Sequence, residues 1–176
     1  MTNIEFLSAV KLLIGAKYEK VDCIGVISKS LGVKMAGTNW LFRSINNSSK
    51  YKYLIERHAC GGGTMPPPGA VVFKTDETRT PKGYESGPDA YHCGVVDTDG
   101  YVIHSSPNIG VRKDMSSRWT KWDYWGLMKQ VEYCGKNDSV DNGGVAYADA
   151  DEPNNYCETL TDRELLEAIY RAVVKD

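Results

Sequence analysis

The segment from residue 91 to residue 105 constrains the fold more than any other part of the sequence. Two runs rich in β-branched and aromatic residues, Tyr91–Asp97 and Tyr101–Ser105, flank Thr98-Asp99-Gly100. This pattern predicts a β-hairpin with a three-residue loop in which Gly100 adopts the left-handed conformation. If Asp97 faces Tyr101, the register of the whole ribbon is fixed, because side chains alternate between its two faces.

This register brings two of the three histidines of the chain together. His104 then faces Gly94 and lies diagonal to His92 on one face of the ribbon, whereas Cys93 points to the other face. Gly94 has no side chain, so we expect it to leave space beside both rings. Two such imidazoles suit a catalytic base and the group that orients it. Taken singly, each could equally be an unrelated half-buried strand residue.

Helical patterns come first along the chain. Apolar residues at helical spacing over residues 4–14 predict an amphipathic helix that ends at Gly15. Asp22 suits the N-cap of a second helix that begins near Cys23, although this Val- and Ile-rich run could also be a buried strand. One or two short helices are expected between residues 38 and 57.

Strand patterns follow the glycine and proline runs at residues 61–68. We expect strands from Gly69 onward, in the hairpin, near Val111 and around residues 129–133. Helices first and an antiparallel meander second define an α+β fold. The polar loop of residues 75–89 is longer than most connections and could border a substrate groove.

The C-terminal part of the sequence predicts a linker and one more helix. Residues 135–158 are polar, with several acids and a pair of glycines. Thr161-Asp162-Arg163-Glu164 is a capping-box sequence, and it opens an apolar helical face. We therefore expect one domain over residues 1–134, a polar linker, and an amphipathic helix over residues 159–176 docked on the same domain.

Composition and charge limit the classes of binding partner and the cellular compartment that we expect for this protein. A net charge of −2, without a run of basic residues, argues against nucleic acid. The N-terminal sequence has no basic region followed by an apolar run, and no later stretch is long and apolar enough to span a membrane. We expect synthesis in the cytoplasm without a signal peptide, and the sequence leaves the oligomeric state open.

The cysteines indicate thiol chemistry. Five cysteines form an odd set without a Cys-x-x-Cys pair, namely Cys23, Cys60, Cys93, Cys134 and Cys157. This pattern favours reduced thiols over a disulfide framework or a zinc site, so we expect no metal and no cofactor. Neither His58 nor the neighbouring Cys60 is assigned a role.

Cys23 is the candidate nucleophile. An ordinary thiol with a pKa of about 8.5 is only about 3% thiolate at pH 7, and a helix N-terminus alone does not lower that pKa enough. A nearby histidine is therefore required. Without one, Cys23 is better interpreted as a small buried hydrophobic residue.

Several segments together resemble the NlpC/P60 family of cell-wall cysteine peptidases. The resemblance covers residues 15–133, and Ile24 and Ala70 replace the serine and the aspartate usual in the family's motifs. The matching segments are Gly15-Ala16-Lys17-Tyr18 (Gly-x-x-Tyr), Val21-Asp22-Cys23-Ile24-Gly25 (Asp-Cys-Ser-Gly), Pro68-Gly69-Ala70-Val71 (Pro-Gly-Asp-Leu), Tyr91-His92-Cys93-Gly94-Val95-Val96 (His-Val-Gly-Ile-Tyr) and Val102-Ile103-His104-Ser105 (Ile-His-Ala).

The resemblance implies a papain-like fold in which N-terminal helices pack on an antiparallel β-sheet. It also implies Cys23 as nucleophile, His92 as base and His104 as the orienting third residue. Tyr18 and Asp22 would be neighbours of the site. The implied activity is hydrolysis of amide bonds in peptidoglycan stem peptides or cross-bridges through an acyl-enzyme. Because peptidoglycan lies outside the cytoplasm, we expect delivery by a phage, release as an endolysin, or non-classical export.

Two alternatives stay open at this point. The first is an N-acetylmuramoyl-L-alanine amidase of the CHAP type, against which His104, in place of an acid or amide, argues. The second is an inert wall-binding or virion structural module, in which Cys23 would react no faster than Cys60 or Cys157.

Overall fold

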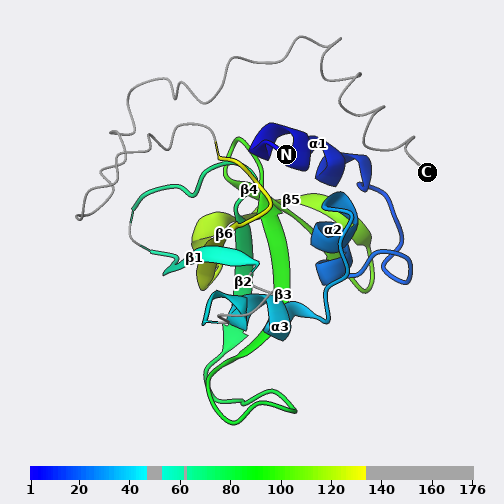
Figure 1. Ribbon diagram of the computed structural model, residues 1–176. Coiled ribbons are helices and arrows are strands. Elements are labelled where there is room, and N and C mark those ends of the chain that lie inside the picture. Colours follow the sequence, from blue (N-terminus) through cyan, green and yellow to red (C-terminus); the bar gives the residue numbers. More distant parts are fainter. Residues whose placement is uncertain (47–52, 62, 134–176) are drawn as a thin grey trace.

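The computed structural model describes residues 1–46, 53–61 and 63–133, and these residues form an α+β fold (Figure 1). The predicted linker and C-terminal helix lie outside the described residues. The helices are α1 (Asn3–Leu12), α2 (Cys23–Ser30) and α3 (Thr38–Arg43), with 3₁₀ turns at Ser44–Asn46 and Trp119–Lys121. The strands are β1 (Leu54–Ala59), β2 (Val71–Asp76), β3 (Asp89–Val96), β4 (Tyr101–Ser106), β5 (Gly110–Arg118) and β6 (Tyr124–Met128).

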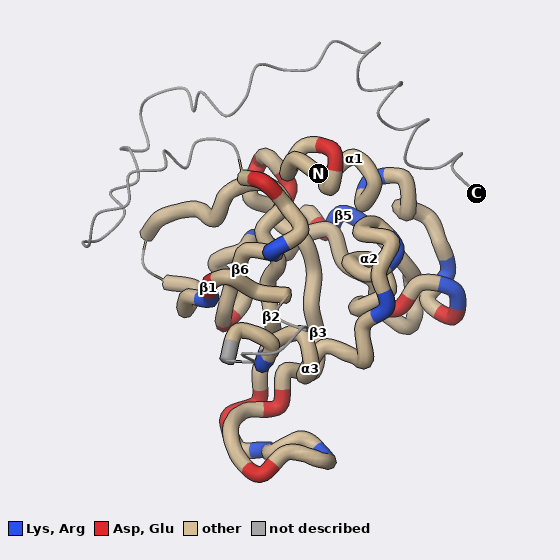
Figure 2. The backbone as a smooth tube through the Cα atoms, viewed as in Figure 1, with Lys and Arg blue, Asp and Glu red and all other residues tan. Residues whose placement is uncertain are grey.

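The six strands form one antiparallel sheet in the order β1-β6-β2-β3-β4-β5. Helix α2 contacts both β3 and β4, α3 contacts β3, and α1 packs on α2. Charged residues of both signs are spread along the backbone (Figure 2). Among the described residues, no helix is both long and apolar enough to cross a membrane.

Both N-terminal helices begin at a capping residue. Thr2 caps α1 through a capping box with Glu5, so the helix begins one residue before the predicted range. Asp22 caps α2, as predicted, and its Oδ1 accepts a hydrogen bond of 2.7 Å from the backbone N–H of Gly25. The segment from Cys23 is therefore a helix, and the strand alternative is wrong.

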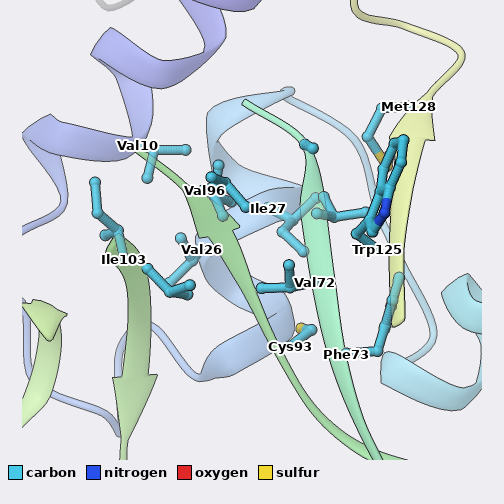
Figure 3. Packing of buried hydrophobic residues seen from close by; sticks show 14 of the residues in the cluster. Val10, Val26, Ile27, Val72, Phe73, Cys93, Val96, Ile103, Trp125 and Met128 are labelled. Carbon is cyan, nitrogen blue, oxygen red and sulfur yellow. The ribbon is translucent and has the colours of Figure 1, made fainter. Parts of the chain in front are cut away.

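The hydrophobic core lies between the helices and the sheet (Figure 3). Side chains from the helices meet side chains from the central strands, and all of them are fully buried: Val10, Val26 and Ile27 against Val72, Phe73, Cys93, Val96 and Ile103. Each large apolar side chain buried in this way contributes about 1.5–3 kcal/mol to folding. The packing fixes α2 against β3 and β4.

The predicted hairpin and its register are confirmed. Val95 pairs with Ile103 and Val96 with Val102, and the backbone N–H of Asp97 donates to the carbonyl of Tyr101 over 2.8 Å. Gly100 closes the loop with a φ of 77°, which a residue with a side chain rarely adopts.

Strands β3 and β4 are paired only near the hairpin loop. Further along, His92 of β3 pairs with Lys74 of β2, whereas His104 of β4 pairs with Arg112 of β5. The two histidines therefore stand at the point where the strands part. Helix α2 contacts both strands, and its first residue, Cys23, interacts with His92.

Gly94 has a different role from the predicted one. A Cβ atom at this position would lie 2.5 Å from Val102 Cγ1, and 3.0 Å from both His104 Cβ and the carbonyl oxygen of Ile103. Gly94 therefore does not leave free space beside the rings. It lets β4 come close enough for His104 to approach His92.

Two expectations for the strands are wrong. One short helix, α3, lies in the range of residues 38–57 where one or two were expected, but the end of that range belongs to strand β1, because pairing with β6 decides the conformation over a weak local pattern. The last strand is β6 rather than residues 129–133. β6 fills the position between β1 and β2, and the Tyr133 hydroxyl then binds back to the carbonyl of Gly69 over 3.1 Å.

Candidate active site

Cys23 is the first residue of α2, and it is buried with 9% of its surface exposed. The segment before the helix is held to the sheet, because the Ser105 hydroxyl of β4 donates a 2.6 Å hydrogen bond to the carbonyl of Val21. The thiol therefore has a fixed position at the N-terminus of a helix, where the backbone dipoles favour a negative charge.

Two further polar groups meet the Cys23 sulfur from elements far away in the sequence. Thr38, the first residue of α3, has its Oγ1 3.6 Å from Cys23 Sγ and 3.6 Å from Cys93 Sγ. Cys93 lies on β3 and is completely buried. The site thus contains two thiols that contact the same hydroxyl group.

These neighbours make Cys23 strongly acidic, lowering the pKa of its thiol to about 3. The largest cause is a hydrogen bond from the Cys93 thiol, and hydrogen bonds from His92 and Thr38 and the positive charge of the His92 ring add to it, against the opposing effect of burial. Cys23 is therefore a thiolate at neutral pH.

The thiol of Cys93, in contrast, is a very weak acid. Burial raises its thiol pKa well above the ordinary value, and the neighbouring Cys23 raises it further. Cys93 therefore keeps its proton and donates it in a hydrogen bond to the Cys23 thiolate. Within this pair, the Cys23 sulfur is the candidate nucleophile and the Cys93 thiol is a hydrogen-bond donor.

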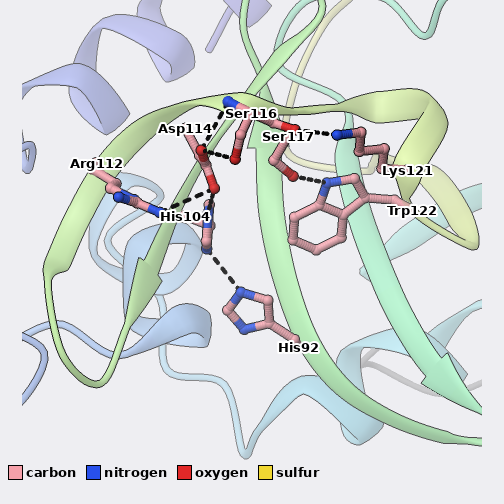
Figure 4. Close-up of polar contacts among 8 residues, drawn as sticks. All are labelled: His92, His104, Arg112, Asp114, Ser116, Ser117, Lys121 and Trp122. Carbon is pink, nitrogen blue, oxygen red and sulfur yellow. Dashed lines mark hydrogen bonds and ion pairs between the residues drawn. The ribbon is translucent and has the colours of Figure 1, made fainter.

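The two predicted histidines are in direct contact (Figure 4). His92 Nε2 lies 2.9 Å from His104 Nδ1. Because Nε2 of His92 is engaged by His104, its Nδ1 is the nitrogen that remains for the thiol. Trp122 stacks on the His92 ring at a centroid distance of 5.4 Å, and its Nε1 is anchored to the Ser117 hydroxyl over 3.0 Å. The indole limits the rotation of the imidazole.

Asp114 of β5 extends the chain of contacts by one residue. Its Oδ2 lies 3.4 Å from His104 Nε2 and 3.2 Å from Arg112 Nη2. Its Oδ1 accepts hydrogen bonds from the Ser116 hydroxyl (2.7 Å) and the Ser116 N–H (3.0 Å). Chiefly because of the Ser116 hydroxyl, the pKa of Asp114 is lowered to about 2. The carboxylate is therefore charged at neutral pH.

A consistent direction of proton donation follows from these contacts. A carboxylate only accepts, so His104 Nε2–H donates to Asp114. Burial, together with the nearby His92, lowers the pKa of His104. Neutral His104 then accepts at Nδ1 from His92 Nε2–H, which leaves His92 Nδ1 free to exchange a proton with Cys23.

We expect Asp114→Asn to lower kcat by about tenfold, far less than the ~10⁴-fold lost when a carboxylate bonded directly to the catalytic base is replaced. The amide can donate to His104 Nε2 and so favours the other tautomer of His104. Asp99→Asn, which changes an exposed acid in the hairpin loop, is the matched control. Nitrogen NMR of the His104 ring checks the cause, and an unchanged tautomer in Asp114→Asn would contradict the assigned role.

The remaining predicted neighbours of the site have clear positions. Tyr18 is half-buried, and its pKa is raised first by burial and then by the charge of Cys23, which places the phenol near the thiolate. Asp22 is exposed and acts as the N-cap of α2. His58 lies on edge strand β1 and stacks on Trp125. Over residues 1–46, 53–61 and 63–133, no cluster of three potential metal ligands occurs.

A cleft of about 560 Å³ opens beside Thr38. The loop between β2 and β3 borders it, as the length of that loop led us to expect. Aromatic and cationic side chains line it, among them Trp40, Arg79, Lys82, Tyr84 and Tyr91. Because Thr38 contacts the Cys23 sulfur, one end of the cleft lies next to the nucleophile.

Four members of the site were missed in the sequence: Thr38, Cys93, Asp114 and Trp122. Asp114 pairs opposite Val102, so it lies on the same face as His104 once the register of β5 is known. Thr38 and Trp122 depend on the docking of α3 and of the segment after β5, and Cys93 depends on the docking of α2 on β3; the sequence carries no local signal for any of these. Searches against models of protein families, curated proteins and solved structures found no match for this chain.

Proposed function

We propose that the protein is a cysteine peptidase of the NlpC/P60 type, with a papain-like core, that hydrolyses amide bonds in peptidoglycan stem peptides or cross-bridges. The observation that carries the proposal is the series of contacts from His92 through His104 to Asp114 beside Cys23, whose thiol pKa His92 helps to lower. A nucleophile, a base, and a group that orients the base are the parts that nucleophilic acyl transfer requires.

The mechanism begins with attack of the Cys23 thiolate on the carbonyl carbon of the scissile amide. The oxyanion that forms accepts a hydrogen bond from the backbone N–H of Cys23, which has no partner within the first turn of α2. The Tyr18 hydroxyl, which lies near the Cys23 sulfur, is a second candidate donor to the oxyanion. His92 donates its Nδ1 proton to the leaving amine, and an acyl-enzyme remains.

Hydrolysis of the acyl-enzyme uses the same groups in reverse. Neutral His92 removes a proton from water, the hydroxide attacks the thioester, and Cys23 leaves as a thiolate. His104 and Asp114 hold the His92 ring in one orientation throughout and stabilise its positive charge. The low pKa of Cys23 makes it a good leaving group at this step.

The cleft beside Thr38 is the proposed binding site for the peptide on one side of the scissile bond. Its aromatic walls suit the apolar parts of short side chains. Lys82 and Arg79 suit the free carboxylates of stem peptides, although Arg79 also pairs with Asp89 over 2.9 Å. Peptidoglycan is thus the proposed partner.

Mass spectrometry of digested peptidoglycan tests the proposal. The full chain is incubated with purified cell walls of several cross-bridge types, and the soluble products are analysed. We expect new amino termini inside the peptides, with the remaining stems still joined to the sugars. Walls treated with Cys23→Ala are the control.

Other products would support other functions. Release of intact stem peptides from the muramic acid would indicate the amidase. No release from any wall type, together with iodoacetamide labelling of Cys23 no faster than that of Cys60, would indicate an inert module and overturn the proposal.

A further inference from the structure

The mechanism above requires one thiol, yet the site contains two. Cys23 and Cys93 approach each other from α2 and β3, and Thr38 Oγ1 lies 3.6 Å from each sulfur. Each thiol also shifts the pKa of the other, that of Cys23 downward and that of Cys93 upward. Both thiols are free. The Tyr18 phenol also lies near both, since each of the two cysteines raises its pKa. Cys93 is therefore a second thiol within the same small group of side chains as the nucleophile.

We propose that Cys23 and Cys93 form a reversible disulfide when a hydroperoxide oxidises Cys23, and that this bond switches the nucleophile off. The inference goes beyond the proposed function, because it concerns only the two sulfurs and requires no substrate. It makes the pair a site of oxidative modification that takes a small peroxide as oxidant and a dithiol as reductant.

The first step is oxidation of the thiolate. Cys23 attacks one oxygen of hydrogen peroxide, the O–O bond breaks, and the leaving hydroxide takes a proton to become water. The sulfur is oxidised by two electrons to a sulfenic acid, and the peroxide is reduced. Cys23 meets the requirement for this step, since reactivity toward peroxide follows thiolate character.

The second step forms the S–S bond. The Cys93 sulfur attacks the Cys23 sulfur, the S–O bond breaks, and the Cys93 proton leaves with the hydroxyl group as a second water. Because the pKa of Cys93 is raised, its thiol stays protonated and is by itself a weak nucleophile. Here, both sulfurs contact the same Thr38 hydroxyl, and the high effective concentration that results offsets the weak nucleophilicity of Cys93.

The disulfide protects Cys23 from further oxidation as well as inactivating it. A sulfenic acid without a neighbouring thiol is oxidised further to sulfinic acid, which ordinary dithiols do not reduce. A disulfide with Cys93 blocks that route and is reopened by a dithiol. Cys60 does not compete, because burial raises its pKa to about 12 and it lies at the end of β1, where its N–H binds the carbonyl of Asp123.

The test uses the full chain with Cys60, Cys134 and Cys157 replaced by serine, so that only the two thiols of the site remain. The protein is treated with hydrogen peroxide and digested without reductant, and the peptides are weighed. We expect one cross-linked peptide pair containing Cys23 and Cys93, lighter by two hydrogen atoms. Dithiothreitol should restore both thiols and the labelling of Cys23 by iodoacetamide.

Cys93→Ala in the same background is the comparison, with Cys93→Val as a second variant that keeps more of the buried volume. We expect both to gain two oxygen atoms on Cys23 and to stay unlabelled after dithiothreitol. Formation of sulfinic acid in the two-thiol protein as fast as in these variants would overturn the proposal. The masses report on the sulfurs alone, so this outcome is distinguishable from an absence of peptidase activity.

Discussion

Cys23→Ala is expected to abolish the release of new amino termini from peptidoglycan while the protein stays folded. The substitution removes the only atom that forms the acyl bond in the proposed mechanism, so no residual route through an acyl-enzyme exists. The alanine keeps the first turn of α2, whose N-cap is Asp22. Circular dichroism and thermal unfolding check the fold, and assays of free amino groups check the activity.

The matched control for Cys23→Ala is Cys60→Ala, which removes another free thiol and should leave the rate unchanged. Undiminished release by Cys23→Ala would contradict the assignment of the nucleophile. A loss of activity accompanied by a collapse of the thermal transition would require Cys23→Ser, which keeps the polar atom and the volume, as a second variant.

The pH dependence of alkylation examines the same residue without a substrate. Because the pKa of Cys23 is lowered to about 3, the thiolate is present above that pH and is lost only as the pH falls toward it. Labelling by iodoacetamide should therefore be nearly constant between about pH 5 and pH 8. Labelling of Cys60, whose pKa is raised to about 12, should instead be slow and rise with pH.

His92→Ala is expected to lower the rate of hydrolysis at least about 100-fold, because general acid–base catalysis typically contributes 10²–10⁴. The variant loses the proton donor for the leaving amine and one of the groups that lower the pKa of Cys23. His58→Ala, on the edge strand, is the matched control and should retain the activity. A loss below about threefold would mean that the base is a different group.

The sequence was sufficient to predict the part of the site that local chemistry specifies. Thr98-Asp99-Gly100 fixes the hairpin loop, and the loop fixes the register that brings His92 to His104. Asp22 gives the start of α2 and thereby the position of Cys23 in its first turn. In each case, the signal and the structure that it specifies lie within a few residues of each other.

The rest of the fold depends on contacts between distant segments. Nothing local indicates that β6 lies between β1 and β2, so strand β1 was not predicted. Thr38 reaches Cys23 only because α3 packs on β3, and Asp114 reaches His104 only through the register of β5 with β4. Such positions follow from packing over the whole sheet, which a single sequence does not encode in short motifs.

The backbone at the start of the chain runs beside the segment that follows β6. The N–H of Glu132 donates to the carbonyl of Met1 over 2.8 Å, and that of Asn3 to the carbonyl of Glu132 over 2.9 Å. The first residues and the segment after β6 therefore lie side by side at one point of the described structure. Units with adjacent ends are readily inserted into loops of other proteins or permuted circularly. We therefore expect the described residues to tolerate insertion into a surface loop of another protein, with Cys23 and both histidines in the same relative positions.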